Sequence, residues 1–375
     1  MDFNLSEEQQ AVADLAGQIF SGHLTPERFK AVDATEDRVD RELWAELAKA
    51  GLLGISLPTE HGGSGQGFLA TSMLLEQAGR HAAPVPLLAT TIGALAVAEF
   101  GTPAQQATLL PAIAGGTLVF APALVEPGTP PSAPATSARP EGPGRRLDGS
   151  KTCVPAGAIA DRLLVPAATG TTGVGVFIVD PSSPGVSVTR LITTTGDAEA
   201  RIELDGVIVD GDQLLGGEGA DGAAMVDWIV TRTTSGICSI LAGACKQAVS
   251  LTAEYAKTRE QFDRPIATFQ AVSQRAADAY IDAEAVQLTS RQAAWRLSEG
   301  LPATEEVAIA KFFAAEAGQR VVHAAQHIHG GTGVDRDYPL HRYFLLAKQL
   351  ELTLGGTTAQ LLKIGAQLAA EPATV

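Results

Sequence analysis

Apolar residues recur at helical spacing through the first third of the chain, where they alternate with polar residues to define one buried face per segment. Ser6 can cap the first such segment, and Gly51 and Gly54 can end the second. The pattern predicts helices over residues 8–20, 41–53, 68–80 and 87–100. Residues 1–118 are therefore predicted to form an N-terminal helical domain.

The pattern changes after residue 118, where short β-branched runs lie between clusters of Gly, Pro, Asp and Ser. The stretch 127–143 is rich in Pro, Ala, Gly and Ser and is predicted to be a loop. Strands are predicted at 163–165, 175–179, 186–188, 200–204 and 207–209, with a turn at Asp205–Gly206 between the last two. A small antiparallel β domain over 119–220 follows.

Long apolar-periodic segments return after residue 220. Small residues at 235–236 and 242–244 would let neighbouring helices approach closely, and Gly300-Leu301-Pro302 breaks the pattern. Helices are predicted over 228–257, 269–297, 304–329, 340–354 and 358–368. Residues 221–375 therefore form a predicted C-terminal helical bundle domain, which gives an α+β chain of three domains.

Composition narrows the classes of function. The 375 residues are 45% hydrophobic and carry a net charge of −15, which indicates a large core and argues against nucleic acid or an anionic membrane as partner. The acidic N-terminus and the lack of a run of 18 apolar residues predict a cytoplasmic protein without signal peptide or membrane span. Cys238 and Cys245 are predicted to be buried, reduced thiols, and no cysteine spacing suggests zinc.

The run from Arg259 to Gln270 is the first candidate site. A guanidinium presents a planar fork that suits a pyrophosphate, and the amide of Gln270 can bind amide or ribose groups. The alternative is a surface arginine that is favoured by the dipole at the end of a helix.

The run His327-Ile328-His329-Gly330-Gly331 is the second. Glycines at a helix end allow positive φ and let a ligand touch the backbone, although a simple helix cap needs the same residues. His327 and His329, two apart, point to different sides of a helix, so no metal site is predicted.

Together with Tyr338–Tyr343 and Leu354–Thr358, these runs resemble the acyl-CoA dehydrogenase family over nearly the whole chain. The resemblance implies that the first run grips the diphosphate of FAD in a neighbouring subunit, and that the second contacts the same FAD near its adenosine and pyrophosphate. His327 stands where the family usually has Gln. The cofactor-binding residues so implied are Arg259, Gln261, Phe262, Gln270, His327, Gly330 and Gly331.

The chain departs from the family in the β domain. The loop that lies against flavin and substrate in the family reads Val125-Glu126-Pro127-Gly128 here. A family Trp is replaced by Cys153, and a hydroxyl residue that binds the flavin ring is replaced by Pro155, which has no N–H. The flavin-ring cradle is therefore predicted to be degraded, unless other residues bind the ring.

The expected base is also missing. Removing the proton α to a thioester needs a carboxylate, which the family supplies at one of two positions. The first is Gly355, or Leu354 if the spacing slips by one, and the second is Thr231. No catalytic residue is assigned. Asp227 and Glu351 are fallback bases, each with a solvated or ion-paired role as the alternative.

The family's Arg-Asp pair in the final helices is replaced by Leu345-Leu346, which also points away from a self-sufficient active site. The hypothesis is a subunit that lacks the glutamate of an α2β2 acyl-CoA dehydrogenase resembling those of steroid side-chain β-oxidation. A homologous partner would carry the base, acyl-CoA would be the substrate, and an electron-transfer flavoprotein would be the acceptor. The alternatives are a self-sufficient homotetramer with a displaced base, and a flavin monooxygenase or dehydratase-like relative. A scaffold without flavin is disfavoured by Arg259 and Gln270.

Overall fold

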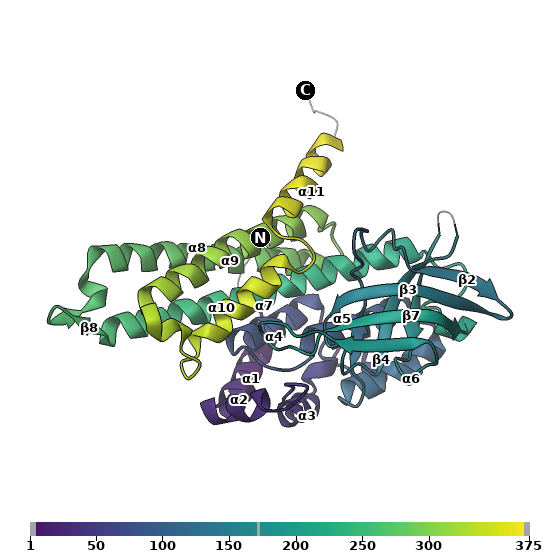
Figure 1. The fold of residues 1–375 in the computed structure, drawn as a ribbon, viewed down its shortest axis with the longest axis horizontal. Coiled ribbons are helices and arrows are strands. Elements are labelled where there is room, and N and C mark those ends of the chain that lie inside the picture. The colour runs from purple at the N-terminus through teal and green to yellow at the C-terminus, as the bar shows by residue number, and fades with distance from the viewer. Residues whose placement is uncertain (1–4, 171–172, 371–375) are drawn as a thin grey trace. The chain divides into compact units, whose positions relative to one another are not determined.

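The computed structural model describes residues 5–170 and 173–370, and it confirms an α+β chain of helices, then a sheet, then helices (Figure 1). The helices predicted at 68–80 and 87–100 have those bounds, whereas the sequence pattern missed the helices Pro26–Asp33 and Pro103–Ala114. The helix predicted over 41–53 ends at Lys49, because Gly51 takes a left-handed φ of 72° and a separate 3-10 turn follows. The first helices are α1 (Glu7–His23), α2 (Pro26–Asp33), α3 (Arg41–Lys49), α4 (Phe68–Arg80), α5 (Leu87–Phe100) and α6 (Pro103–Ala114), with 3-10 turns at Leu52–Gly54 and Thr59–His61.

The chain divides into two compact units, each built from separated segments. The first unit contains Met1–Phe29, Gly67–Ala83 and Thr234–Val375, and the second contains Lys30–Gln66 and Pro84–Thr233. The N-terminal helices are thus shared between the units, and each unit is described by itself below.

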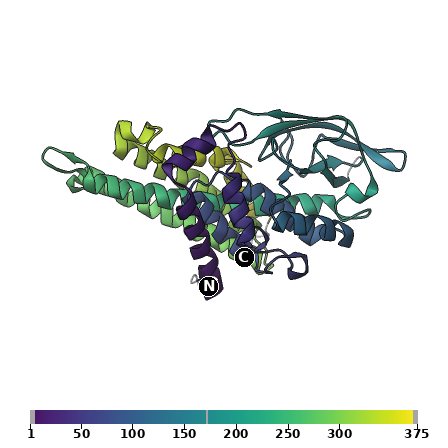
Figure 2. The same cartoon turned by 90° about the horizontal axis from the view of Figure 1, so that it is seen from below.

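A curved seven-stranded sheet forms the centre of the second unit (Figure 2). Its order is β1-β4-β2-β3-β7-β6, with β5 also paired to β4, and the pairing is antiparallel except for β1 and β2 against β4. Leu147, Phe177 and Ile202 lie in its buried core. The strands are β1 (Phe120–Pro122), β2 (Ser137–Glu141), β3 (Gly144–Val154), β4 (Arg162–Ala168), β5 (Val174–Val179), β6 (Val186–Arg190) and β7 (Ala200–Val209).

Two predictions in this region are wrong. The turn at Asp205–Gly206 does not exist, because both flanking runs pair with β3 and form the single strand β7. The register shifts there, so Asp205 and Gly206 form a bulge opposite Asp148, whose Oδ1 accepts the Gly206 N–H at 2.9 Å. The stretch 127–143 is not all loop, since β2 lies within it and pairs with β3.

The first unit is a helical bundle in which the part of α7 (Gly222–Thr258) from Thr234 onward, α8 (Gln270–Ser298) and α9 (Thr304–His329) run side by side (Figure 1). Helices α10 (Leu340–Leu352) and α11 (Thr357–Ala370) follow and pack on α9. Helix α7 has the length and hydropathy of a membrane span, but 61% of its most apolar window is buried, as in the core helix of a soluble protein. Cys238 and Cys245 on α7 are buried and unbridged as predicted, and burial raises the pKa of both thiols to about 12.

Helix α4 is embedded against α7 and α8 within this unit. Side chains at Gly79 and Gly243 would collide with the backbone of the facing helix, so glycine permits this close approach. The hydroxyls of Ser72, Ser239 and Ser290 form a buried chain across the three helices, with contacts of 2.8 and 3.3 Å.

Candidate functional site

A hairpin connects α7 to α8 and carries the first predicted motif. Strands β8 (Glu260–Gln261) and β9 (Arg264–Pro265) pair, and the two residues between them, Phe262 and Asp263, both have left-handed φ values of 55° and 61°. A two-residue turn of this kind matches the right-handed twist of the paired strands. The Ile266 N–H donates to the Arg259 carbonyl at 2.8 Å and closes the base of the hairpin.

The predicted residues of this motif are all exposed. Arg259 lies at the base of the hairpin, and Phe262 lies at its tip with 86% of its surface exposed. Gln270 is the first residue of α8, at the end where unpaired N–H groups and the helix dipole favour an anion. One short connection therefore presents a guanidinium, an amide and a helix N-terminus, a donor set that suits a diphosphate.

The second motif forms the turn after α9. Gly330 takes φ 58° and ψ −133°, a conformation that is essentially restricted to glycine. Its carbonyl accepts the Gln326 amide at 3.1 Å. His327, Gly330 and Gly331 are exposed, so a ligand can reach the backbone of this glycine turn.

The two motifs meet through residues that were given no role from the sequence. Tyr255, one helical turn before Arg259, stacks on His329 with ring centroids 4.3 Å apart, and its hydroxyl lies 3.4 Å from Thr332 Oγ1. His329 immediately precedes Gly330. The hairpin and the glycine turn therefore lie at the same end of the bundle. No local sequence pattern marks this contact, because Tyr255 and His329 are 74 residues apart.

A side chain at Gly355, in the turn that would carry a base, would be strained and crowded. Leu354 and Gly355 both have left-handed φ values, of 57° and 96°. A Cβ on Gly355 would lie 2.9 Å from the Ala359 Cβ. The amide of buried Gln360 donates to the carbonyls of Leu354 and Gly355 at 3.3 and 3.0 Å and holds the turn in this shape.

The other candidate bases form hydrogen bonds within their own helices or are exposed. The Thr231 hydroxyl donates to the Asp227 carbonyl at 2.7 Å within α7, and Asp227 itself is exposed. The Glu351 carboxylate accepts the Lys348 ammonium at 2.6 Å. The ammonium of fully buried Lys311 donates to the carbonyls of Leu350 and Glu351 at 2.7 and 2.9 Å, which caps the end of α10.

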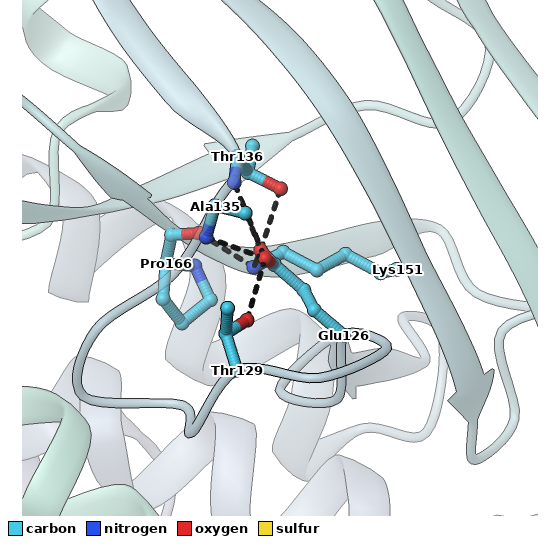
Figure 3. Close-up of polar contacts among 6 residues, drawn as sticks. All are labelled: Glu126, Thr129, Ala135, Thr136, Lys151 and Pro166. Atoms are coloured by element: carbon cyan, nitrogen blue, oxygen red, sulfur yellow. Dashed lines mark hydrogen bonds and ion pairs between the residues drawn. The ribbon is translucent and has the colours of Figure 1, made fainter.

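Glu126, in the loop that differs from the family pattern, is the centre of a buried network (Figure 3). Its carboxylate accepts the Ala135 N–H and both the N–H and the hydroxyl of Thr136, and it pairs with the Lys151 ammonium at 2.5 Å. Burial alone would raise the pKa of Glu126, but hydrogen bonds from Lys151 and Thr136 outweigh it and hold that pKa below its usual range. The ionised pair fixes the loop to β3.

The segment that follows Lys151 has few hydrogen-bond donors for a polar ring such as a flavin. Cys153 is exposed with a left-handed φ of 48°, and Pro155 has no N–H to donate. The Thr152 N–H is used by the Val125 carbonyl at 2.9 Å. No group of three or more His, Cys, Asp or Glu that could hold a metal ion occurs within 5–170 and 173–370.

Comparison with known proteins identifies the family that this chain resembles. Family profiles match twice, "Acyl-CoA dehydrogenase, N-terminal domain" over residues 6–117 and "Acyl-CoA dehydrogenase, C-terminal domain" over 213–369. The chain is 43% identical to acyl-CoA dehydrogenase FadE27 of Mycobacterium tuberculosis, over 100% of both chains.

Two solved structures are similar at the same 43% identity. One is the ChsE4-ChsE5 complex from M. tuberculosis, with a TM-score of 0.94 and 100% of both chains covered. The other is a single-residue variant of the Tcur3481-Tcur3483 steroid ACAD, with a TM-score of 0.90, covering 97% of this chain and 98% of that one.

Proposed function

The chain belongs to the acyl-CoA dehydrogenase family, and from that premise we propose that it is the subunit that completes a partner's FAD site and lacks the catalytic base. Members of this family are FAD-dependent oxidoreductases that desaturate acyl-CoA thioesters. The observation that carries the proposal is the Leu354–Gly355 turn, which bears no carboxylate and whose left-handed Gly355, with its Cβ position 2.9 Å from the Ala359 Cβ, disfavours one.

The residues at the end of the bundle fit one part of FAD. The exposed Arg259 guanidinium can form two parallel hydrogen bonds with a diphosphate, and Gln270 and the glycine turn add amide and backbone donors. Gln261, Phe262 and His327 complete the exposed set. When bound, FAD supplies a flavin that accepts hydride from the β-carbon of the acyl group.

The segment 153–156 does not fit the flavin ring, because Pro155 cannot donate a hydrogen bond and Cys153 replaces an aromatic ring. We therefore place the flavin ring on the partner, with this chain holding the diphosphate. The proton α to the thioester is then removed by a glutamate of the partner, while Arg259 and Gln270 orient the cofactor and hold no reacting proton.

The relatives support a proposal for the partner and for the substrate. One similar structure is a ChsE4-ChsE5 complex, and another is described as a steroid ACAD. We propose an α2β2 assembly with a homologous, glutamate-bearing subunit that acts on a bulky, steroid-type acyl-CoA. An electron-transfer flavoprotein would be the acceptor, and the cytoplasm would be the location.

The test is co-expression with a homologue that retains the glutamate, followed by flavin quantification and a desaturation assay. The expected assembly contains two FAD per tetramer and is active only with both chains. The chain purified alone with stoichiometric FAD and desaturase activity would overturn the proposal and favour a homotetramer that uses Asp227 or Glu351.

Arg259→Ala probes the cofactor assignment directly. It should empty the assembly of FAD while the subunits stay associated, and Arg259→Lys should retain part of the flavin, because a point charge replaces the fork. Arg201→Ala is the matched control, since it removes an exposed guanidinium that pairs with Glu203 on the sheet. Unchanged FAD content in Arg259→Ala would remove the assignment.

A further inference from the structure

Three aromatic side chains link the hairpin to the glycine turn. The ring of Tyr255 stacks on His329 with an interplanar angle of 25°, and the Tyr338 ring lies 5.1 Å from His329 and 6.3 Å from Tyr255. They come from α7, from the last residue of α9, and from the segment before α10. Each pair is in van der Waals or edge contact, so the three rings form one closed cluster, which we call the aromatic clasp.

Hydrogen bonds determine the tautomer of His329, the central residue of the clasp. His329 is 3% exposed, and its Nδ1 lies 2.8 Å from the Ala325 carbonyl, which can only accept. Nδ1 therefore carries the proton, and Nε2 of the neutral ring accepts the Tyr338 hydroxyl at 3.0 Å. Burial lowers the pKa of His329 and favours this neutral form.

The aromatic clasp is connected directly to the Arg259 hairpin and to the Gly330–Gly331 turn. The Tyr255 carbonyl accepts the Arg259 N–H at 2.8 Å, and the Arg259 carbonyl closes the hairpin. His329 is bonded in sequence to Gly330, whose glycine-only conformation begins the turn. Movement of Tyr255 or His329 would therefore shift the hairpin and the glycine turn relative to each other.

We propose that Tyr255, His329 and Tyr338 are positioning residues that hold the Arg259 hairpin and the Gly330–Gly331 turn in the relative placement that binds one FAD. The inference rests on the proposed function, because it takes FAD as the ligand of both segments. None of the three residues is required to touch the cofactor. Their contribution is preorganisation, which removes the cost of bringing the two segments together on binding.

The test separates hydrogen bonding from packing at His329. His329→Leu fills the space and loses both bonds, whereas His329→Gln keeps an oxygen that can accept from Tyr338. In the co-expressed, FAD-loaded assembly, His329→Leu should raise the FAD dissociation constant by about five- to tenfold, the scale of one buried hydrogen bond with an aromatic stack. His329→Gln should recover part of that loss. FAD release is followed by flavin fluorescence.

Tyr255→Leu provides a second variant, and it should also raise the FAD dissociation constant by about fivefold, whereas Tyr255→Phe, which keeps the stack, should change it less. Tyr280→Leu is the control, because it removes a tyrosine that is 57% exposed on α8 and lies outside the clasp. Subunit association is measured by mass photometry in every variant.

The outcomes are distinct. If His329→Leu and Tyr255→Leu bind FAD like wild type while Arg259→Ala is empty, the clasp inference is wrong and the proposed function stands. If Arg259→Ala also keeps FAD, the proposed function itself fails. If His329→Gln is as impaired as His329→Leu, the Tyr338 hydrogen bond has no positioning role.

Discussion

The most direct prediction concerns Gly355, the position at which a catalytic glutamate would be expected. Any side chain there meets two penalties. A left-handed φ costs a residue with a Cβ about 1–2 kcal/mol, and a Cβ placed 2.9 Å from the Ala359 Cβ forces the turn to shift, at about 1–3 kcal/mol. We therefore expect Gly355→Ala to lower the unfolding free energy by about 2–5 kcal/mol.

The adjacent glycine supplies a matched control. A Cβ on Gly356 would meet only the Glu351 carbonyl, at an ordinary 3.5 Å, and its φ is not left-handed. Gly356→Ala should stay within about 0.5 kcal/mol of wild type. Urea unfolding followed by tryptophan fluorescence, to which Trp295 on α8 of the same unit contributes, measures both variants.

The functional counterpart is Gly355→Glu. It should destabilise the chain at least as much as Gly355→Ala and should give the chain alone no desaturase activity, because the turn must first change its backbone. The reasoning is refuted if Gly355→Ala and Gly356→Ala are equally stable, or if Gly355→Glu makes the isolated chain active.

The remaining predictions concern stability. Lys151→Met leaves the buried Glu126 carboxylate unpaired and should cost about 3–5 kcal/mol in urea unfolding. Because the pKa of Glu126 is lowered in the folded chain, the wild-type contribution should be complete above pH about 4.5 and lost as the pH falls further, and a flat acid profile would contradict this. Burial lowers the pKa of Lys311 to about 8. Between about pH 8 and pH 10.5 the unfolded chain therefore binds more protons than the folded chain, so the stability of the folded chain rises with pH. Over that range the unfolding free energy of wild type should increase by up to about 3 kcal/mol relative to Lys311→Met. Gly243→Ala should destabilise the bundle by more than about 1 kcal/mol through collision with the α4 backbone, whereas Gly365→Ala, in open space on α11, should stabilise it by about 0.5–1 kcal/mol, as measured by thermal unfolding.

Local sequence signals determined the helices well where both ends carry a stop. The helix predicted over 304–329 has those bounds because Pro302 precedes it and Gly330 cannot continue it. The sheet was harder to predict. Asp205-Gly206 is a common turn dipeptide, but whether it turns or bulges depends on whether the next run finds the same partner strand, which is a long-range property.

The candidate site shows the same division. Arg259 and Gly330 could be identified from the sequence as candidate binding residues, and the family resemblance implied FAD as their ligand. That Tyr255 joins them could not be predicted, because the contact links residues 74 apart that share no local pattern. The left-handed φ of Gly355 was likewise hidden, since glycine alone does not reveal which of its conformations is used.

The discontinuous first unit has a consequence for how the chain is made. Helix α4 leaves the ribosome long before the α7 and α8 segments that cover its Ser72 and Gly79 face are synthesised. During that interval its apolar side chains, among them Met73, Leu74 and Leu75, lack their native neighbours. Nascent chains that stop before α8 should therefore recruit holdase chaperones, and folding of this unit should be completed only after release.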